Sequence, residues 1–272
     1  MVFLVCLLIG IMTAFIGAVA GIGGGVILVP SLFFMQSISE DFSWATPQAI
    51  VGISLVTMIF TGLSSTLTYV KGKRIDYRTG VLFLIGSIPG GAVGAWLNQF
   101  INADVFLLYF GMIMIAISLL MFIKRNRSIT TLDTKMSGVR SITLHGINYQ
   151  YRIPVLGAII LSLCVGILSG LFGIGGGSII VPAMILLFSV PAHIATATSM
   201  FMIFFVSITG SITHLALGNI LWEYAIFFIP GAWIGGRIGA WLNQRLPGKM
   251  LEWILRILLI IIGIRMIFQG LA

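Results

Sequence analysis

Two nearly identical glycine-rich segments, which we call the glycine words, are the most distinctive chemical feature of the sequence. The word GIGGG stands at residues 21–25 and again at 173–177. Four glycines in five residues disfavour a helix, yet apolar residues continue on both sides, so we expect a new helix to begin at the end of each word. The first N–H groups of a helix lack partners and carry partial positive charge, and glycine lets a ligand approach them. Each word therefore predicts an anion site made mainly of backbone, at Gly23, Gly24, Gly25 and Val26 and at Gly175, Gly176, Gly177 and Ser178.

The alternative interpretation of the glycines is close helix packing, because small residues line many helix interfaces in membranes. The chain has 33 glycines, so many of them must serve packing alone. We assign that role to GSIPGGAVGAW at 86–96 and GAWIGGRIGAW at 231–241, and we assign the glycine words to substrate. A dinucleotide-binding fingerprint is excluded, since no strand–turn–helix context surrounds either word.

Hydroxyl-rich segments follow each glycine word, at 47–70 and at 193–216. Hydroxyls can donate hydrogen bonds to an oxyanion without adding charge. We therefore expect Ser54, Thr198 and Ser199 to be secondary substrate contacts. The alternative is that these hydroxyls bind carbonyls of their own or neighbouring helices.

Ionisable residues within apolar segments are few. Arg237 is a candidate electrostatic contact, although a long side chain can also snorkel to the membrane interface. His193 and His214 are expected at interfaces, and no Asp or Glu lies deep in an apolar segment, so the sequence offers no obvious cation-coupling site. The three histidines and two cysteines fit no metal spacing, and we expect neither a cofactor nor an enzyme.

The composition shows which elements must position these residues. The chain is 59% hydrophobic and 8% charged over 272 residues, and several apolar stretches reach the 18 or more residues that a membrane span requires. The sequence therefore predicts a polytopic protein whose surroundings are a lipid bilayer. The net charge of +8 is attributed to basic loops that set orientation and not to nucleic-acid binding.

The chain contains an internal duplication. The two glycine words are 152 residues apart, and GAWLNQ at 94–99 recurs at 239–244 with an offset of 145; an ordered double match indicates a repeat. We divide the chain into a first membrane repeat at 1–123, a polar linker at 124–152 and a second membrane repeat at 153–272.

Basic residues concentrate in the 71–78 loop, the linker and the 245–249 turn, which predicts that these segments are cytoplasmic. Matched apolar segments then cross in opposite directions, and both chain ends lie outside. The segments 26–36 and 178–190 are too short for an easy crossing. We therefore expect an all-α polytopic membrane protein of two inverted-topology repeats, each a glycine-broken re-entrant helical hairpin plus three transmembrane helices. An assembly of several copies is left open.

The chain resembles the sulfite exporter TauE/SafE family of membrane permeases. The resemblance rests on GAVAGIGGGVILVP at 17–30, GLFGIGGGSIIVP at 170–182, ATATSM at 195–200 and GAWIGGRIGAWL at 231–242. It implies transport of small sulfur-containing anions, such as sulfite or organosulfonates, across the cell membrane. We expect an exporter that works by alternating access; the alternatives are an uptake carrier for another small solute and a membrane scaffold or sensor without flux. Ile53 stands where the second repeat has Thr198, so the two hydroxyl segments are not strictly symmetric.

Overall fold

The protein was analysed as a computed structural model, which describes residues 2–120, 138–144 and 147–271. Within these residues the chain forms ten α-helices, two short 3-10 helices and one two-stranded sheet. In chain order the elements are α1 (Val2–Ala20), α2 (Gly25–Ile38), η1 (Glu40–Phe42), α3 (Pro47–Lys71), α4 (Tyr77–Leu97), η2 (Asn98–Phe100), α5 (Ala103–Leu120), β1 (Val139–Leu144), β2 (Ile147–Arg152), α6 (Val155–Phe172), α7 (Gly177–Leu186), α8 (Ala192–Ala216), α9 (Trp222–Asn243) and α10 (Gly248–Leu271).

Seven of the described helices are long and apolar enough to cross a membrane: α1, α3, α4, α6, α8, α9 and α10. The helices that follow the glycine words are shorter. With 14 residues in α2 and 10 in α7, they span about 21 Å and about 15 Å at the helical rise, less than the ~30 Å thickness of a hydrocarbon core. The chain is a mostly helical, multi-pass membrane protein.

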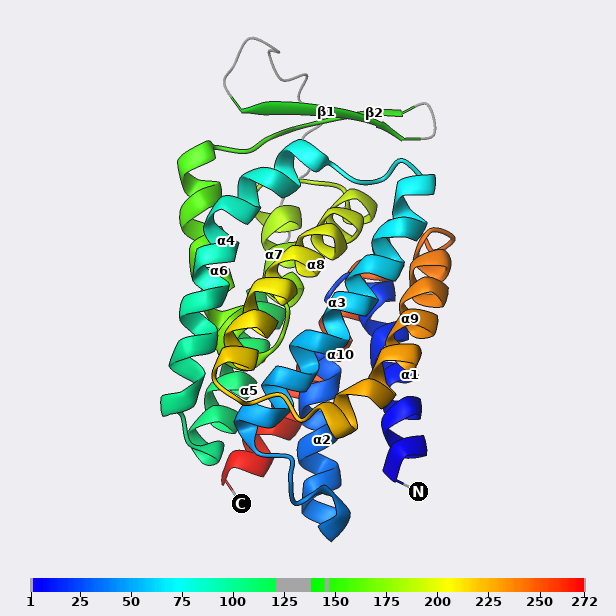
Figure 1. Ribbon diagram of the computed structural model, residues 1–272. Coiled ribbons are helices and arrows are strands. Elements are labelled where there is room, and N and C mark those ends of the chain that lie inside the picture. Colours follow the sequence, from blue (N-terminus) through cyan, green and yellow to red (C-terminus); the bar gives the residue numbers. More distant parts are fainter. Residues whose placement is uncertain (1, 121–137, 145–146, 272) are drawn as a thin grey trace.

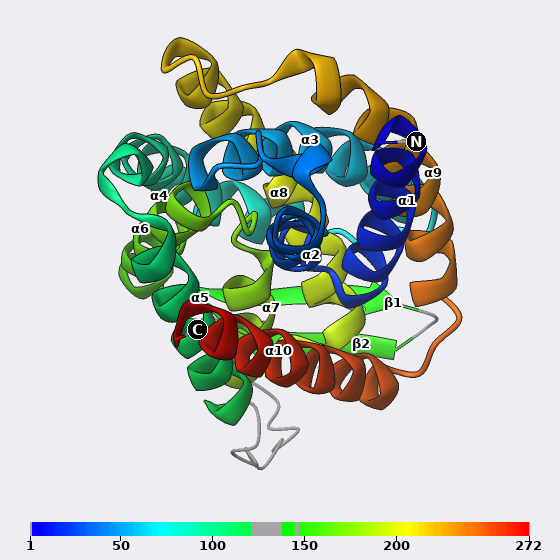
Figure 2. The same cartoon turned by 90° about the horizontal axis from the view of Figure 1, so that it is seen from below.

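The helices run along one common direction between two ends of the molecule (Figure 1). The β1–β2 sheet lies at one end, which we call the hairpin end, and both chain termini lie at the other, the terminus end. α3 runs from the terminus end to the hairpin end, and α8 runs the opposite way. α1 and α6 are likewise opposed, as are α4 and α9. Seen along the bundle, α2 and α7 lie in the interior, surrounded by the longer helices (Figure 2).

Glycine stripes bring the outer helices together. The most extensive contacts in the bundle join α4 to α6 and α1 to α9. A Cβ built on Gly94 would lie 1.9 Å from the Ile167 carbonyl oxygen, and one on Gly239 would lie 2.3 Å from the Phe15 carbonyl oxygen. No side chain fits at either position, which confirms the packing role predicted for the segments 86–96 and 231–241.

The two-stranded sheet was not predicted from the sequence. β1 and β2 pair antiparallel, from Val139 with Arg152 to Leu144 with Ile147, inside the segment that was predicted only as a polar linker. A partial signal was present: apolar and polar residues alternate over 142–144 and 147–152, as in a half-buried strand. The abundance of Ser, Thr and Arg concealed this alternation.

A buried tyrosine fastens the sheet to the helices. The Tyr151 hydroxyl donates to the Asp76 carboxylate at 2.6 Å, and the same carboxylate accepts from the Thr79 amide at 3.1 Å, capping the start of α4. Burial, and then the charge of Asp76, raise the pKa of the Tyr151 hydroxyl. Nearby, the Arg74 guanidinium donates to the Gln244 carbonyl at 2.8 Å, and burial lowers its pKa. The hairpin end is therefore tied down by polar contacts between α4, the sheet and the end of α9.

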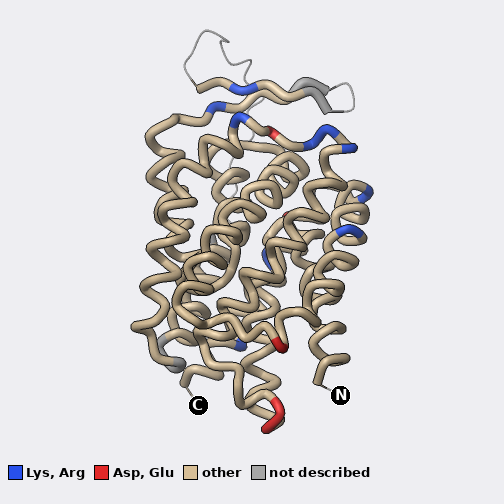
Figure 3. The backbone as a smooth tube through the Cα atoms, in the orientation of Figure 1, with Lys and Arg blue, Asp and Glu red and all other residues tan. Residues whose placement is uncertain are grey.

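Charge is distributed unevenly between the two ends. Lysine and arginine gather mainly at the hairpin end, and acidic residues concentrate at the terminus end (Figure 3). This is the charge asymmetry from which the orientation in the membrane was predicted.

Candidate functional site

The two glycine words lie against each other in the middle of the bundle. Gly23 and Gly24 have φ values of +87°, and Gly175 and Gly176 have values of +70° and +69°, a left-handed conformation that glycine adopts without strain. A Cβ built on Gly25 would lie 2.2 Å from the Gly173 carbonyl oxygen, and one on Gly177 would lie 2.6 Å from that of Gly21. Backbone meets backbone here, which explains why both words consist almost entirely of glycine.

Two repeat-matched serines connect the words across the halves. The Ser54 hydroxyl donates to the Gly173 carbonyl at 2.7 Å, and the Ser199 hydroxyl donates to the Gly21 carbonyl at 2.6 Å. Both side chains are fully buried. Each serine therefore contacts the glycine word of the other half, and its proton is used to hold that glycine turn. Its oxygen can still accept a hydrogen bond.

The helices that follow the words begin without a side-chain cap. Gly24 and Gly176 occupy the N-cap positions of α2 and α7, and neither position has a side-chain hydrogen bond. By contrast, Thr46 caps α3 by accepting from the Ala49 amide. The N–H groups of the first residues of α7, Gly177 and Ser178, therefore have no partner within the helix.

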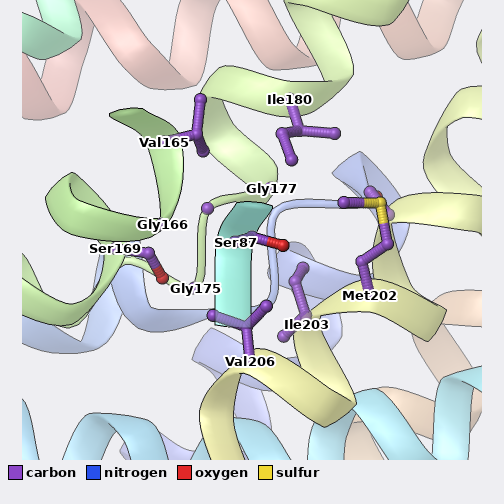
Figure 4. A pocket seen from close by; sticks show the side chains of 12 residues that line it. Ser87, Val165, Gly166, Ser169, Gly175, Gly177, Ile180, Met202, Ile203 and Val206 are labelled. Atoms are coloured by element: carbon purple, nitrogen blue, oxygen red, sulfur yellow. The ribbon is translucent and has the colours of Figure 1, made fainter. Parts of the chain in front are cut away.

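A small, narrow pocket lies beside the second glycine word. Figure 4 shows the Ser87 and Ser169 side chains in the pocket, with the aliphatic side chains of Val165, Ile180, Met202, Ile203 and Val206 around them. Ser169 is completely buried, and its hydroxyl has no hydrogen-bond partner among the described residues. The lining residues are Ser87, Val165, Gly166, Ser169, Gly175, Gly176, Gly177, Ile180, Ser199, Met202, Ile203 and Val206.

The chemistry of this pocket suits a small anion. Its polar groups are hydroxyls and the start of α7, and the rest of the lining is apolar. None of the lining residues is ionisable. An unpaired buried hydroxyl costs roughly 1–3 kcal/mol, so Ser169 gains when a ligand oxygen accepts its proton. Ser178 is also buried with an unpaired hydroxyl, although it is not a lining residue.

The first glycine word has no matching space at its equivalent position. Gly17 stands at the repeat position of Ser169, and a Cβ built on it would lie 2.1 Å from the Gly24 nitrogen. α1 therefore packs directly onto its turn. The predicted residues Gly23 to Val26 are all buried. Of the two glycine words, only the second contributes residues to the pocket.

The other two predicted residues lie elsewhere. The Thr198 hydroxyl accepts from the Asp76 amide at 3.0 Å, which places it against the 72–76 loop. Arg237 is exposed on α9, as expected for a side chain that snorkels. Another arginine that was not singled out, Arg265, is partly buried with its guanidinium 4.3 Å from the centre of the Phe34 ring.

Ser169 and Ser87 were not among the residues predicted from the sequence. Both are single serines within apolar helices, and nothing in their local sequence distinguishes them from packing residues. The repeat did contain a usable signal, since Ser169 replaces the glycine of the first half at Gly17. Among the described residues, no group of three or more His, Cys, Asp or Glu side chains could hold a metal ion.

Comparison with known proteins places this geometry in context. The sequence profile of the family described as sulfite exporter TauE/SafE matches residues 6–266. The chain is 43% identical over 272 residues to "Probable membrane transporter protein YunE" of Bacillus subtilis (strain 168), covering 99% of each chain. It is 26% identical over 274 residues to "Probable membrane transporter protein MJ0441" of Methanocaldococcus jannaschii, covering 96% of this chain and 94% of the relative. No solved structure matches.

Proposed function

Because the chain belongs to the sulfite exporter TauE/SafE family, we propose that it is a permease that moves small sulfur-containing anions, such as sulfite or a sulfonate, across the cell membrane. The observation that carries this proposal is the unpaired, buried Ser169 hydroxyl in a pocket at the uncapped start of α7. A small oxyanion would accept hydrogen bonds from this hydroxyl and from the N–H groups of Gly177 and Ser178.

Ser199 completes the polar part of the proposed site from α8, with its oxygen as an acceptor for a protonated anion such as bisulfite. Ser87 lines the same pocket from α4, and its hydroxyl donates to the Phe83 carbonyl at 2.8 Å. In this assignment the first word, including Gly23, Gly24, Gly25 and Val26, supports the second word instead of binding substrate. Thr198 and Arg237 have no direct contact with the anion.

We further propose that the two halves are inverted repeats that work by alternating access. Two observations support this proposal: matched helices run in opposite directions, and Ser54 and Ser199 make reciprocal bonds to the opposite glycine word. In the same arrangement α1–α2 and α6–α7 are re-entrant hairpins that enter and leave on one side. Transporters of this plan bind substrate near the midplane, where the repeats meet.

The charge asymmetry supports an orientation with the hairpin end in the cytoplasm and both termini outside. In this orientation the protein acts as an exporter. An anion that leaves an inside-negative cell moves downhill by about 2.3 kcal/mol per charge per 100 mV, so export needs no coupling carboxylate.

Flux measurements test the proposal. The purified protein is reconstituted in liposomes, and flux of sulfite, thiosulfate, ethanesulfonate and chloride is measured with and without an imposed voltage. We expect saturable flux of one or more sulfur-containing anions that the voltage alters and that competes with the others. A complete lack of saturable anion flux would refute the permease and favour a scaffold or sensor, and flux that runs only inward would favour an uptake carrier.

A further inference from the structure

The pocket beside the second glycine word contains no charge of its own. None of its lining residues is ionisable. In the described helices that line it, α4, α6, α7 and α8, Arg78 is the only Lys, Arg, Asp or Glu residue. Arg78 is exposed in the first turn of α4, and Ser87 lies about 14 Å further along that helix. An anion in this pocket therefore touches no cationic side chain.

The two histidines of α8 do not change this picture. His193 and His214 lie near opposite ends of the helix, and neither lines the pocket. His214 is fully buried, which contradicts the interfacial position predicted from the sequence, and its Nδ1 lies 3.2 Å from the Asn219 amide nitrogen. The charge that the pocket accepts must therefore be balanced by neutral groups.

Free hydrogen-bond donors are few in the pocket. The Ser87 hydroxyl donates to the Phe83 carbonyl at 2.8 Å, and the Ser199 hydroxyl donates to the Gly21 carbonyl at 2.6 Å. Each of these serines can therefore offer a ligand only the lone pairs of its oxygen. The free donors are the Ser169 hydroxyl and the first N–H groups of α7. Apolar side chains make up most of the remaining lining.

We propose that this site takes oxyanions with a single negative charge, such as bisulfite or a sulfonate, and rejects dianions such as sulfate, thiosulfate and fully ionised sulfite. The inference rests on the proposed permease function and adds the charge of the substrate to it.

The balance of two electrostatic effects supports a single charge. The free energy of removing an ion from water rises with the square of its charge, so it is about four times larger for a dianion than for a monoanion of the same size. The attraction to the start of α7, which carries about half a positive charge, only doubles. Because no cationic side chain lines the pocket, the second charge costs more than it gains.

The hydrogen-bonding groups favour the same ligands. Sulfonate oxygens accept from Ser169 and from the amides of α7, and the carbon substituent suits the apolar wall. Bisulfite can offer its proton to the Ser199 oxygen. Sulfate has only acceptor oxygens, so some of them would face either the lone pairs of Ser87 and Ser199 or apolar side chains. A charged oxygen without a donor is unfavourable in such a place.

The first test uses two ligands that differ mainly in charge. Methanesulfonate and sulfate are both tetrahedral about sulfur, and the methyl group of one replaces a charged oxygen of the other. Each is added as a competitor of sulfite flux into liposomes that contain the purified protein. We expect methanesulfonate to inhibit at a concentration at least about tenfold lower than sulfate, which corresponds to about 1.4 kcal/mol. A smaller ratio would overturn the proposal.

The second test changes the charge of sulfite itself. Bisulfite loses its proton near neutral pH, so at constant total sulfite the monoanion is replaced by the dianion as the pH on both sides is raised through neutrality. After subtraction of the leak through protein-free liposomes, we expect sulfite flux to fall with the bisulfite fraction. Methanesulfonate keeps its charge, and its flux is the control for effects of pH on the protein. Sulfite flux that stays constant or rises relative to this control contradicts the proposal.

A third measurement assigns the selection to this pocket. S169A should raise the methanesulfonate concentration for half-inhibition about tenfold, because a hydrogen bond to a charged group is lost. S162A is the matched control, since Ser162 lies on the same helix and donates to the Ile159 carbonyl. Equal concentrations for the two variants would show that the anion is selected elsewhere, and the proposal would be wrong.

The failure of this inference and the failure of the proposed function give different results. If no sulfur-containing anion shows saturable flux, the proposed function fails, and the site on which this inference rests fails with it. If sulfite flux is saturable but sulfate inhibits as well as methanesulfonate, the permease stands and the restriction to monoanions is refuted.

Discussion

Ser169 is the residue at which the two halves differ most usefully. The first half has Gly17 at this position and leaves no room between α1 and its turn. The second half has a side chain there, and the pocket lies beside it. The Ser169 hydroxyl in the second half is thus a buried polar group that no described protein atom pairs with, and the first half has no equivalent of it.

Replacement of Ser169 by Ala tests this assignment. A hydrogen bond to a charged group contributes roughly 1.5–3 kcal/mol, so S169A should raise the anion concentration for half-maximal flux about tenfold or more. Thermal stability should stay the same or increase, because the hydroxyl has no partner to lose. S162A is the matched control: Ser162 lies on the same helix and donates to the Ile159 carbonyl of that helix. Equal effects of the two substitutions on flux would contradict the assignment.

The serines that cross between the halves should act on stability. S54A and S199A each leave a buried glycine carbonyl without its donor, which costs roughly 1–3 kcal/mol. Both variants should unfold at a lower temperature in detergent than S64A, whose hydroxyl donates to the Thr61 carbonyl of its own helix. If S54A and S199A unfold at the wild-type temperature, these bonds do not hold the glycine turns together.

At the scale of elements, the two kinds of helix start have different roles. α3 and α4 begin with capping side chains, Thr46 and Asp76, and both caps satisfy N–H groups with protein atoms. α2 and α7 begin at left-handed glycines with no such cap. α6, α8 and α9 also begin without a side-chain cap. What distinguishes α2 and α7 is that their starts lie at left-handed glycines that meet in the middle of the bundle, where a ligand oxygen can replace the missing cap.

The sheet should stay attached to α4 in neutral and mildly alkaline solution. The pKa of Tyr151 is raised above its ordinary value of about 10. The stabilisation from its bond to Asp76 is therefore complete below pH about 10 and is lost only as the pH rises through the higher value in the folded protein. Hydrogen exchange of residues 147–152 should increase above that pH. In Y151F exchange should already be faster at neutral pH, and the alkaline increase that comes from Tyr151 should be absent; an identical profile for Y151F would contradict the role of this bond.

At the scale of the whole molecule, the charge asymmetry predicts the orientation in the membrane. A reporter that is active only in the cytoplasm, inserted within residues 124–137, should be active because Lys and Arg concentrate at this end. The same reporter fused to the C-terminus should be inactive. The opposite pair of results would reverse the orientation and the proposed direction of export.

Much of the architecture was predictable because its signals are local or repeated. The glycine words mark real breaks, and the predicted segments 26–36 and 178–190 correspond to α2, Gly25–Ile38, and α7, Gly177–Leu186. The packing role of the glycine stripes was also predictable. Gly94 follows Gly90 and Gly91, and Gly239 follows Gly235 and Gly236, three or four residues earlier, so these glycines share one helix face. Each of these inferences needs only one helix and its periodicity.

The details of the site were not predictable, because they depend on how helices are rotated against each other. Ser54 and Ser199 were placed near substrate, but only the contact between the halves shows that they bind opposite glycine carbonyls. Thr198 is adjacent to Ser199 in the sequence and faces a different loop. Arg237 lies on a helix whose glycines pack against α1, so its side chain points outward, and its sequence position alone did not reveal this.

The contact between Gly25 and the Gly173 carbonyl also limits how a duplicated gene can diverge. After duplication each half is free to change where it faces lipid, but a side chain at Gly25 would strike the backbone of the other half, and the same holds for Gly177 and Gly21. A substitution in one copy cannot be accommodated by a smaller residue in the other, because there is none smaller than glycine. Each glycine word therefore prevents substitution in the other. We expect the two halves to keep the same sequence here longer than anywhere else in the chain.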